Sequence, residues 1–386
     1  MTCSGFNVAT GEAVEVSFSN TITAVEPVLG RLREEAWLAP GFIDLQVNGF
    51  AGVDYNSPET PQEEIARSIR ALFACGVTRF FPTVITGPPE DMLRALANLA
   101  QAKEALSEGA AIEGFHVEGP HISPEDGPRG AHPRAWVRAP DLEEFRRWQE
   151  AARGQVRLVT VAPEWPGVTR YIETLVREGV VVAIGHTNAT AAQIADAVRA
   201  GATLSTHLGN GAHSLLPRHP NYIWDQLAED RLAASFIVDG IHLPASFLKV
   251  ALRAKGVERS ILVTDATTPA GCRPGRYRLG EQEVELTPDQ RVVLAGSERL
   301  AGSALRMDRG VENLMRLAGL SLREAVVMAA RNPARVGRVE HRQRGLTPGD
   351  RADIVRFRYH EAEQRIEILE TYVSGERVYS SAAAPC

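Results

Sequence analysis

The sequence predicts an α/β fold, a (β/α)8 TIM-like barrel joined to a small β-domain, from three observations. Eight short apolar runs mostly alternate with segments whose apolar residues recur at helical spacing, as in parallel α/β proteins. Four of these runs end directly in a residue that can bind a metal or move a proton: Glu118, His186, His207 and Asp265. Both ends of the chain are rich in β-forming and turn residues instead. The length of 386 residues suffices for a barrel and a satellite domain.

The predicted barrel covers residues 39–345. Its first helix is expected to begin with Thr60 as the N-cap, Pro61 at the first position and Glu63 closing a capping box. Gly76 is expected to end that helix. The expected strands are 39–48, 77–83, 112–118, 156–162, 180–185, 203–208, 233–238 and 261–264. The further expected helices are 88–106, 141–152, 167–178, 190–200, 244–255, 307–318 and 321–330.

Two regions depart from this alternation. Residues 1–38 and 346–380 are predicted to form one small β-sandwich domain built from both chain ends. Residues 266–305 interrupt the barrel pattern with three short hairpin strands, at 275–279, 283–286 and 291–294. The small residues at the C-terminal tip are expected to be disordered.

The strand-end residues predict a metal centre. In a (β/α)8 barrel the carboxyl ends of the strands converge, so residues far apart in sequence become neighbours. Glu118, His186 and His207 form a plausible three-ligand set for a catalytic zinc with one position open to water. Asp265 is then the free carboxylate beside that water. A single histidine at a strand end is more often structural, so the prediction rests on the shared placement of all four residues.

Composition narrows the class of protein. The net charge of −6 with mixed signs argues against a nucleic-acid partner. No apolar run approaches the length that spans a bilayer, and residues 1–11 lack the pattern of a signal peptide, so no membrane is expected. The four cysteines are scattered without a C-x-x-C pair, which favours reduced thiols and a cytoplasmic location.

A series of motifs occurs along the chain, in this order: H-V-E-G-P-H, G-A-H-P, G-H-T-N-A-T, S-T-H-L-G-N, D-G-I-H, V-T-D-A-T-T-P-A-G and L-A-G-S-A-L. This series resembles the N-acetylglucosamine-6-phosphate deacetylases, which belong to the amidohydrolase superfamily. The run P-G-F-I-D-L-Q-V-N-G and the later L-T-P-G-D-R-A-D-I-V fit the same family, so the resemblance covers about residues 38 to 357.

The resemblance implies a role for each matching residue. Glu118, His186 and His207 match the metal ligands of the family, and Asp265 matches its catalytic acid-base. His132 matches a histidine that contacts the substrate near the amide carbonyl. The substrate-binding set implied by the resemblance is Ala131, His132, Asn210, Gly211, Arg218, Asp239, His242, Leu300, Ala301 and Gly302. The resemblance also implies a homodimer in which Arg218 reaches the neighbouring active site.

The sequence departs from the family in two places. Many amidohydrolases have H-x-H at the end of the first strand, holding a second metal, whereas this chain has Gln46 and Asn48. Side-chain amides are weak zinc ligands beside imidazole, so we expect one divalent metal ion per chain. Zinc suits the ligand set, and iron, cobalt or manganese would also fit. Around Arg218, residues 209–228 differ from the usual family sequence, although the arginine is kept.

Three functions remain open on the sequence alone. The first is a metal-dependent deacetylase of an N-acetyl amino sugar 6-phosphate, with N-acetyl-D-glucosamine 6-phosphate as the expected small-molecule partner. The second is an amidohydrolase acting on another substrate, such as N-acetylgalactosamine 6-phosphate, an unphosphorylated N-acyl compound or a cyclic amide. The third is a barrel that has lost catalysis, against which the intact set Glu118, His186, His207 and Asp265 argues.

Overall fold

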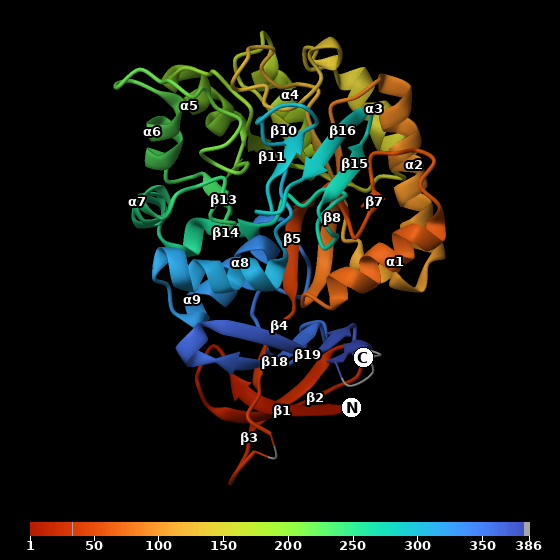
Figure 1. The fold of residues 1–386 in the computed structure, drawn as a ribbon, viewed down its shortest axis with the longest axis vertical. Helices are drawn as coiled ribbons and strands as arrows, with labels where there is room; N and C mark the ends of the chain where they lie inside the picture. The colour runs from red at the N-terminus through yellow and green to blue at the C-terminus, as the bar shows by residue number, and fades with distance from the viewer. Residues whose placement is uncertain (33, 382–386) are drawn as a thin grey trace.

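The computed structural model describes residues 1–32 and 34–381, with a parallel barrel above a smaller sheet made from both chain ends (Figure 1). This arrangement confirms the predicted barrel with its small β-domain. The expected disorder of the C-terminal tip concerns residues outside the described ranges.

Eight parallel strands form the barrel. In spatial order they run β14, β13, β12, β11, β10, β9, β8 and β5. An isolated parallel bridge between Val47 and Ala266 brings the last strand back to the first. The strands are β5 (Phe42–Val47), β8 (Val77–Ile85), β9 (Phe115–Glu118), β10 (Val156–Val161), β11 (Val181–Ile184), β12 (Leu204–Ser205), β13 (Ala233–Ile237) and β14 (Ser260–Val263).

Helices surround these strands (Figure 1). The sequence 190–201 shows why one of them forms: Thr190 and Gln193 make a reciprocal capping box, and Gly201 ends the helix in the left-handed conformation. The α-helices are α1 (Gln62–Phe73), α2 (Pro89–Ala105), α3 (Leu142–Ala151), α4 (Val168–Arg177), α5 (Ala191–Ala200), α6 (Tyr222–Ala228), α7 (Ala245–Lys255), α8 (Met307–Asn313), α9 (Leu322–Val326) and α10 (Asn332–Val336). Short π-helical turns follow α8 and α9, at Leu314–Ala318 and Val327–Arg331.

The barrel is a filled core. One buried cluster draws side chains from seven of the eight strands, among them Leu45, Phe81, Leu158 and Ile261. A second, larger cluster packs the outer sides of the strands against the helices. Because both faces of the sheet are covered, the strands are near-continuous apolar runs in the sequence. No described helix is long and apolar enough to cross a membrane.

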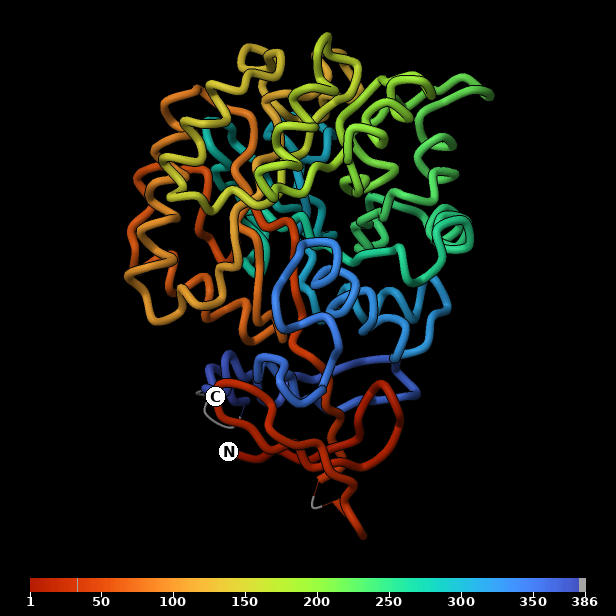
Figure 2. The backbone as a smooth tube through the Cα atoms, turned by 180° about the vertical axis from the view of Figure 1, so that it is seen from behind, coloured from red at the N-terminus to blue at the C-terminus, as the bar shows by residue number. Residues whose placement is uncertain are grey.

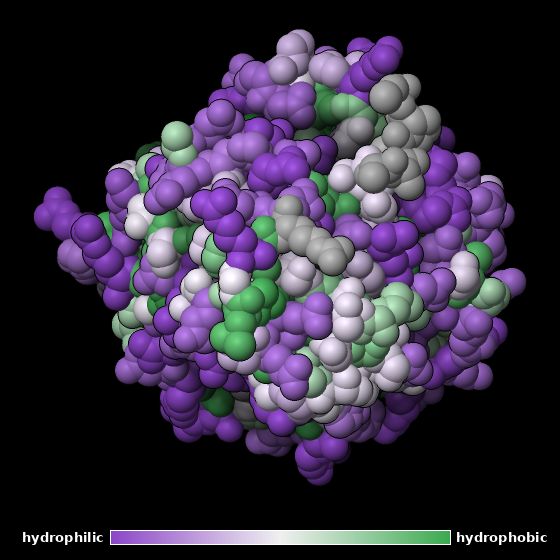
Figure 3. Space-filling model, turned by 90° about the horizontal axis from the view of Figure 1, so that it is seen from below, coloured by the Kyte–Doolittle hydropathy of each residue, from purple (hydrophilic) through white to green (hydrophobic). Residues whose placement is uncertain are grey.

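The small sheet joins the two ends of the chain. Its seven strands run in the order β20, β19, β18, β4, β1, β2 and β3, and strands from both ends of the chain lie together in it, below the barrel (Figure 2). The strands are β1 (Thr2–Asn7), β2 (Ala13–Phe18), β3 (Ile22–Pro27), β4 (Trp37–Pro40), β18 (Ile354–His360), β19 (Arg365–Val373) and β20 (Glu376–Ser380). Seen from this end, the surface is mainly hydrophilic with small scattered apolar groups (Figure 3). The domain boundaries at residues 38 and 346 stay a prediction.

Two short antiparallel sheets lie beside the barrel strands. The insertion after β14 forms a three-stranded sheet of β15 (Gly275–Leu279), β16 (Gln282–Leu286) and β17 (Val292–Leu294), close to the expected hairpin strands. Strands β6 (Gly49–Phe50) and β7 (Val53–Asp54) form the other. Gln282 Nε2 donates to the carbonyl oxygen of Ala131 at 2.8 Å, so the inserted sheet is fastened to the loop that carries His132.

The structure differs from some of the local expectations. Thr60 does not cap α1, because its hydroxyl donates to the carbonyl oxygen of Asp54 and the N-cap is Pro61 without a side-chain hydrogen bond. The expected strand 39–48 is divided, since Ala39 and Pro40 belong to β4 of the small sheet. Helix α6 was not expected, although Asn221 caps it through Ile223 and Trp224.

A buried ion network joins the barrel to the small sheet. Asp353, just before β18, accepts from Arg79 of β8 at 2.7 Å and from Arg342 at 2.5 Å, and all three side chains are buried. Burial alone would raise the pKa of Asp353, but Arg342 and Arg79 hold it far below its usual range. Because the pKa is lowered in the folded state, this carboxylate stabilises the fold above about pH 4 and the stabilisation is lost as the pH falls.

Asp353→Asn is therefore expected to lower the free energy of unfolding at pH 7 by about 3–5 kcal/mol, because two buried guanidinium groups lose their counter-charge. Chemical denaturation at pH 7 measures the loss. Glu90→Gln, which breaks the exposed pair with Arg147, is the control and should leave the unfolding midpoint unchanged. Equal effects of the two substitutions would contradict the stabilising role of the network.

Candidate metal centre and active site

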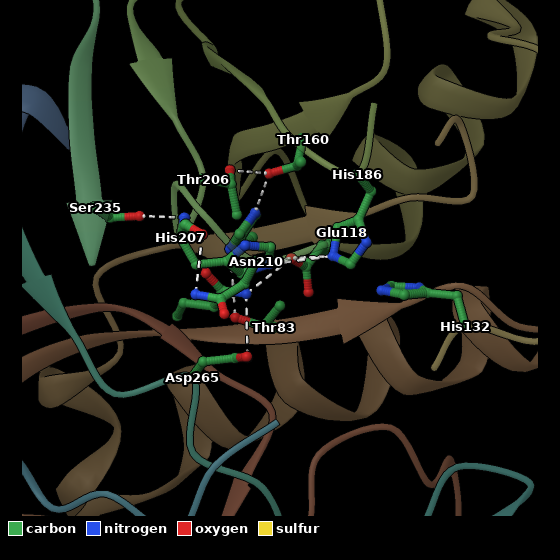
Figure 4. Close-up of polar contacts among 12 residues, drawn as sticks. Thr83, Glu118, His132, Thr160, His186, Thr206, His207, Asn210, Ser235 and Asp265 are labelled. Atoms are coloured by element: carbon green, nitrogen blue, oxygen red, sulfur yellow. Dashed lines mark hydrogen bonds and ion pairs between the residues drawn. The ribbon is translucent and has the colours of Figure 1, made fainter. Parts of the chain in front are cut away.

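Three buried side chains meet at the carboxyl ends of barrel strands. Glu118 is the last residue of β9, and His186 and His207 follow β11 and β12 (Figure 4). The distance from His207 Nε2 to Glu118 Oε1 is 2.8 Å, and that from His186 Nε2 to the same oxygen is 3.3 Å. The two Nε2 atoms lie 3.1 Å apart. The structure thus brings together the three residues that the sequence predicts as metal ligands.

The donor set fits a divalent metal ion. His186 Nδ1 donates to the carbonyl oxygen of Pro128 at 2.7 Å, which leaves the lone pair of Nε2 free for a ligand bond. Burial would raise the pKa of Glu118, but the hydrogen bonds with His186 and His207 hold it well below its usual range, so it remains a carboxylate. Two imidazole nitrogens and one carboxylate facing one point match the ligands of catalytic zinc sites.

The backbone at three site residues is left-handed. His186, His207 and Asp265 have φ angles of 50°, 30° and 49°. Such a conformation costs a non-glycine residue roughly 1–2 kcal/mol, so surrounding hydrogen bonds must hold it. The His207 amide donates to Ser235 Oγ at 2.8 Å, and the Ser303 amide donates to the Asp265 carbonyl at 2.9 Å. Neighbouring elements therefore fix the direction in which these side chains leave the strands.

Asp265 lies beside the metal ligands, held by two amides. Its Oδ1 accepts from Asn48 Nδ2 at 2.7 Å and from Gln46 Nε2 at 3.1 Å. The same Gln46 nitrogen donates to Glu118 Oε1 at 2.8 Å. Burial and the charge of Glu118 raise the pKa of Asp265 to about 6. A carboxyl group with this pKa can accept and return a proton near neutral pH.

His132 lies on the His186 side of the centre (Figure 4). The two imidazole rings meet edge to face, with centroids 4.5 Å apart. His132 Nδ1 is 2.8 Å from Thr86 Oγ1, so Thr86 fixes the orientation of the ring. Burial, followed by the charge of His186, lowers the pKa of His132 to about 3, so the ring is neutral.

A cavity of about 140 Å³ opens over this centre. Most of the expected substrate-binding residues line it: Ala131, His132, Asn210, Gly211, His242, Leu300, Ala301 and Gly302. Further lining residues were not predicted as site residues, among them Ile85, Gly130, Ile237, Thr267, Leu279 and Gln282. Leu279 and Gln282 come from the inserted sheet, and no local sequence signal marks them as part of a site.

Asp239 and Arg218, the other two expected substrate-binding residues, do not line the cavity. Both oxygens of Asp239 are engaged: Oδ2 is 2.6 Å from His242 Nδ1, and Oδ1 accepts from the amides of Ile241 and His242, each at 2.8 Å. Asp239 therefore orients His242, which faces the cavity. Arg218 is exposed on the loop before α6, which projects from the body of the fold (Figure 1).

Comparisons with known proteins agree with this geometry. Residues 37–378 match the family model of the amidohydrolase family. The N-acetylglucosamine-6-phosphate deacetylase of Bos taurus is 36% identical over 353 residues, covering 89% of this chain and 83% of that protein. The Bacillus subtilis (strain 168) protein of the same name is 34% identical, covering 82% and 80% of the two chains.

Solved structures give the same result. An aspartate-to-alanine mutant of N-acetyl-D-glucosamine-6-phosphate deacetylase from Mycobacterium smegmatis, in complex with N-acetyl-D-glucosamine-6-phosphate, is similar with a TM-score of 0.88 and 30% identity. The alignment covers 98% of this chain and 99% of that chain. The N-acetylglucosamine-6-phosphate deacetylase of Thermotoga maritima has a TM-score of 0.86 at 26% identity, with 99% and 100% covered. This chain therefore belongs to the amidohydrolase family and, within it, to the N-acetylglucosamine-6-phosphate deacetylases.

Proposed function

We propose that this protein hydrolyses the acetamide of N-acetyl-D-glucosamine 6-phosphate, releasing acetate and the amino sugar phosphate. The observation that supports this most is the convergence of Glu118, His186 and His207 beside Asp265, in a chain whose relatives carry that enzyme's name. Zinc is the proposed metal, because it suits two imidazoles and one carboxylate, and iron, cobalt and manganese accept the same donors.

The proposed mechanism assigns a task to each group. A divalent ion held by Glu118, His186 and His207 supplies a Lewis acid that lowers the pKa of water and polarises the carbonyl. Asp265 removes a proton from the attacking water and later returns it to the departing amine. With Oδ1 fixed by Asn48 and Gln46, Asp265 keeps Oδ2 for this transfer.

His132 is proposed to stabilise the oxyanion that develops on the acetyl carbonyl. If the Thr86 hydroxyl donates to Nδ1, the neutral ring carries its proton on Nε2 and can donate it to that oxygen. A donor of this kind typically contributes about 100- to 1000-fold to the rate. His242, oriented by Asp239, is proposed to contact the sugar phosphate.

The phosphate site is proposed to be completed in a homodimer. Arg218 lies outside the cavity of its own chain, so its proposed role requires a neighbouring subunit. Large apolar side chains are exposed close to it in the chain, with Leu215 88% exposed on the same loop and Trp224 47% exposed on α6. Such groups support a protein contact at this face.

A cytoplasmic location is also proposed. Cys3, Cys75 and Cys272 are free thiols, and among the described residues no disulfide is formed. Free thiols of this kind are typical of a reducing compartment.

Acetate release from a substrate panel tests the proposal. N-acetyl-D-glucosamine 6-phosphate should be the preferred substrate over N-acetylgalactosamine 6-phosphate and unphosphorylated N-acetylglucosamine. Equal activity with and without the phosphate would instead favour an amidohydrolase of another N-acyl compound on the same metal centre.

Arg218→Lys is expected to raise KM for the 6-phosphorylated substrate by about 10-fold, because lysine cannot reproduce the bidentate contact of a guanidinium with phosphate. KM for the unphosphorylated analogue should stay unchanged. Arg170→Lys, at an exposed position on α4, is the control. A similar rise in KM for both substrates would show that Arg218 does not contact the phosphate.

A further inference from the structure

The barrel is closed at one place by a side chain. Strands β5 and β14 are the two ends of the barrel sheet, and the bridge of Val47 with Ala266 joins them. Next to this bridge, the amide of Thr264 donates to Asp44 Oδ1 at 3.2 Å and not to a carbonyl of β5. The Thr264 hydroxyl donates to Asp44 Oδ2 at 2.5 Å. A side-chain carboxyl group on β5 thus takes the place of the usual backbone ladder.

The residue held in this way is the direct neighbour of Asp265. The amide of Ala266 donates to the Thr264 hydroxyl at 3.1 Å, and Ser303 Oγ donates to the Thr264 carbonyl at 2.5 Å. The backbone on both sides of Asp265 is therefore fixed by hydrogen bonds. Since Asp265 itself is left-handed, with φ of 49°, removal of these bonds allows the turn to relax towards an ordinary conformation.

Burial of Asp44 in this position costs desolvation free energy. Its side chain is fully buried, and it does not line the cavity. Burial raises its pKa to about 7, against the effect of the hydrogen bonds from Thr264. Its hydrogen-bond partners among the described residues are Thr264 and the amide of Gln46, and neither is a cation. An apolar contact would close the barrel at lower cost in desolvation, so closure alone does not explain a carboxyl group here.

We propose that Asp44 is a positioning residue for the reaction, which acts through Thr264 to hold Asp265 in its left-handed turn beside the metal ligands. Gln46 and Asn48, two and four residues further along the chain, hold the carboxyl group of Asp265, so one segment fixes both its backbone and its side chain. The inference rests on the proposed acid-base role of Asp265. It adds a residue that touches neither metal nor substrate.

Two substitutions of Thr264 test this role with little change in shape. Thr264→Val removes the hydroxyl and keeps the branched side chain, whereas Thr264→Ser keeps the hydroxyl. We expect Thr264→Val to lower kcat by roughly 10- to 100-fold, since misplacement of a reacting group by about 1 Å can cost 100-fold. KM and bound metal should stay near the wild-type values. Thr264→Ser should restore most of kcat.

A buried threonine elsewhere supplies the control. The hydroxyl of Thr371 donates to the carbonyl oxygen of Phe73 at 2.8 Å, away from the cavity. Thr371→Val should lower Tm by an amount similar to Thr264→Val and leave kcat unchanged. A kcat loss in Thr264→Val no larger than in Thr371→Val overturns the inference. Loss of metal from Thr264→Val does so too, because the defect would then lie in the metal site.

A double-mutant cycle ties the effect to Asp44. Asp44→Asn should lower kcat, and adding Thr264→Val should cost little more, because both changes remove the same hydrogen bond. Additive losses would show that Asp44 does not act through Thr264. If Asp44→Asn does not fold, the comparison of Thr264→Val and Thr264→Ser with the control Thr371→Val still tests the positioning role. If the wild type hydrolyses no substrate of the panel, the proposed function and this inference are both refuted. If the wild type is active and Thr264→Val is as active, only the positioning role is refuted.

Discussion

Asp265→Asn is expected to lower kcat for deacetylation by roughly 100- to 10,000-fold, the range for loss of a general acid-base group. Asparagine has the same size, and its oxygen can still accept from Asn48 and Gln46 as Asp265 Oδ1 does. It cannot take a proton from water or return one to the amine. The bound metal should remain, since the proposed ligands are Glu118, His186 and His207.

The pH profile gives an independent measurement. The base form of Asp265 is the carboxylate, and burial together with the charge of Glu118 raises its pKa, so kcat/KM of the wild type should rise with pH as this group loses its proton. The rise should be absent in Asp265→Asn. Asp308→Asn, a buried aspartate of α8 paired with Arg306, is the control and should leave the profile unchanged. Loss of metal from Asp265→Asn would show that Asp265 is a ligand.

The convergence of the site could be predicted from sequence because it depends on local signals. Each of Glu118, His186, His207 and Asp265 ends or directly follows an apolar strand, and the barrel brings those ends together. A chain distance of 147 residues between Glu118 and Asp265 (265 minus 118) is no obstacle, since the strand ends meet at one rim. The left-handed turns at three of these residues were not predictable, because φ above zero is favoured by glycine and none of the three is one.

The contacts that hold the site could not be predicted, because they depend on how the barrel closes. Gln46 and Asn48 were interpreted as replacements for second-metal ligands, and the structure shows that they also hold Asp265. Thr86 lies 46 residues from His132 in the chain, and the hydrogen bond between them exists only after β8 and the His132 loop are packed. Tertiary contacts of this kind leave no periodic pattern in the sequence.

The expected helix cap at Thr60 shows that local sequence signals can also fail. Threonine followed by proline and glutamate is a strong local signal for a helix start, but the Thr60 hydroxyl finds the carbonyl oxygen of Asp54 instead. The strand and turn before the helix decide the partner. Asp239 is a second example. Its place in the motif suggests substrate contact, but its oxygens accept hydrogen bonds from the side chain and the amide of His242.

Glu118→Gln is expected to remove the metal and with it at least as much activity as Asp265→Asn. Glu118 Oε1 is the one carboxylate oxygen that both imidazoles approach, and a neutral amide is a far weaker ligand than a carboxylate. The wild type should contain one equivalent of divalent metal per chain. Gln46 Nε2 donates to both Glu118 Oε1 and Asp265 Oδ1, and an N–H donor beside these two carboxylates disfavours a second cation there.

Metal analysis of chelator-free protein measures both expectations. Glu312→Gln is the matched control, because Glu312 is fully buried but engaged by Arg309, Arg316 and the amide of Ile366. This control should keep one equivalent of metal. A Glu118→Gln protein that still holds its metal would contradict the ligand assignment, and two equivalents in the wild type would contradict the single-metal site. If the wild type and Asp265→Asn each hold one equivalent of metal and Glu118→Gln holds none, Asp265 is the free carboxylate that the mechanism requires.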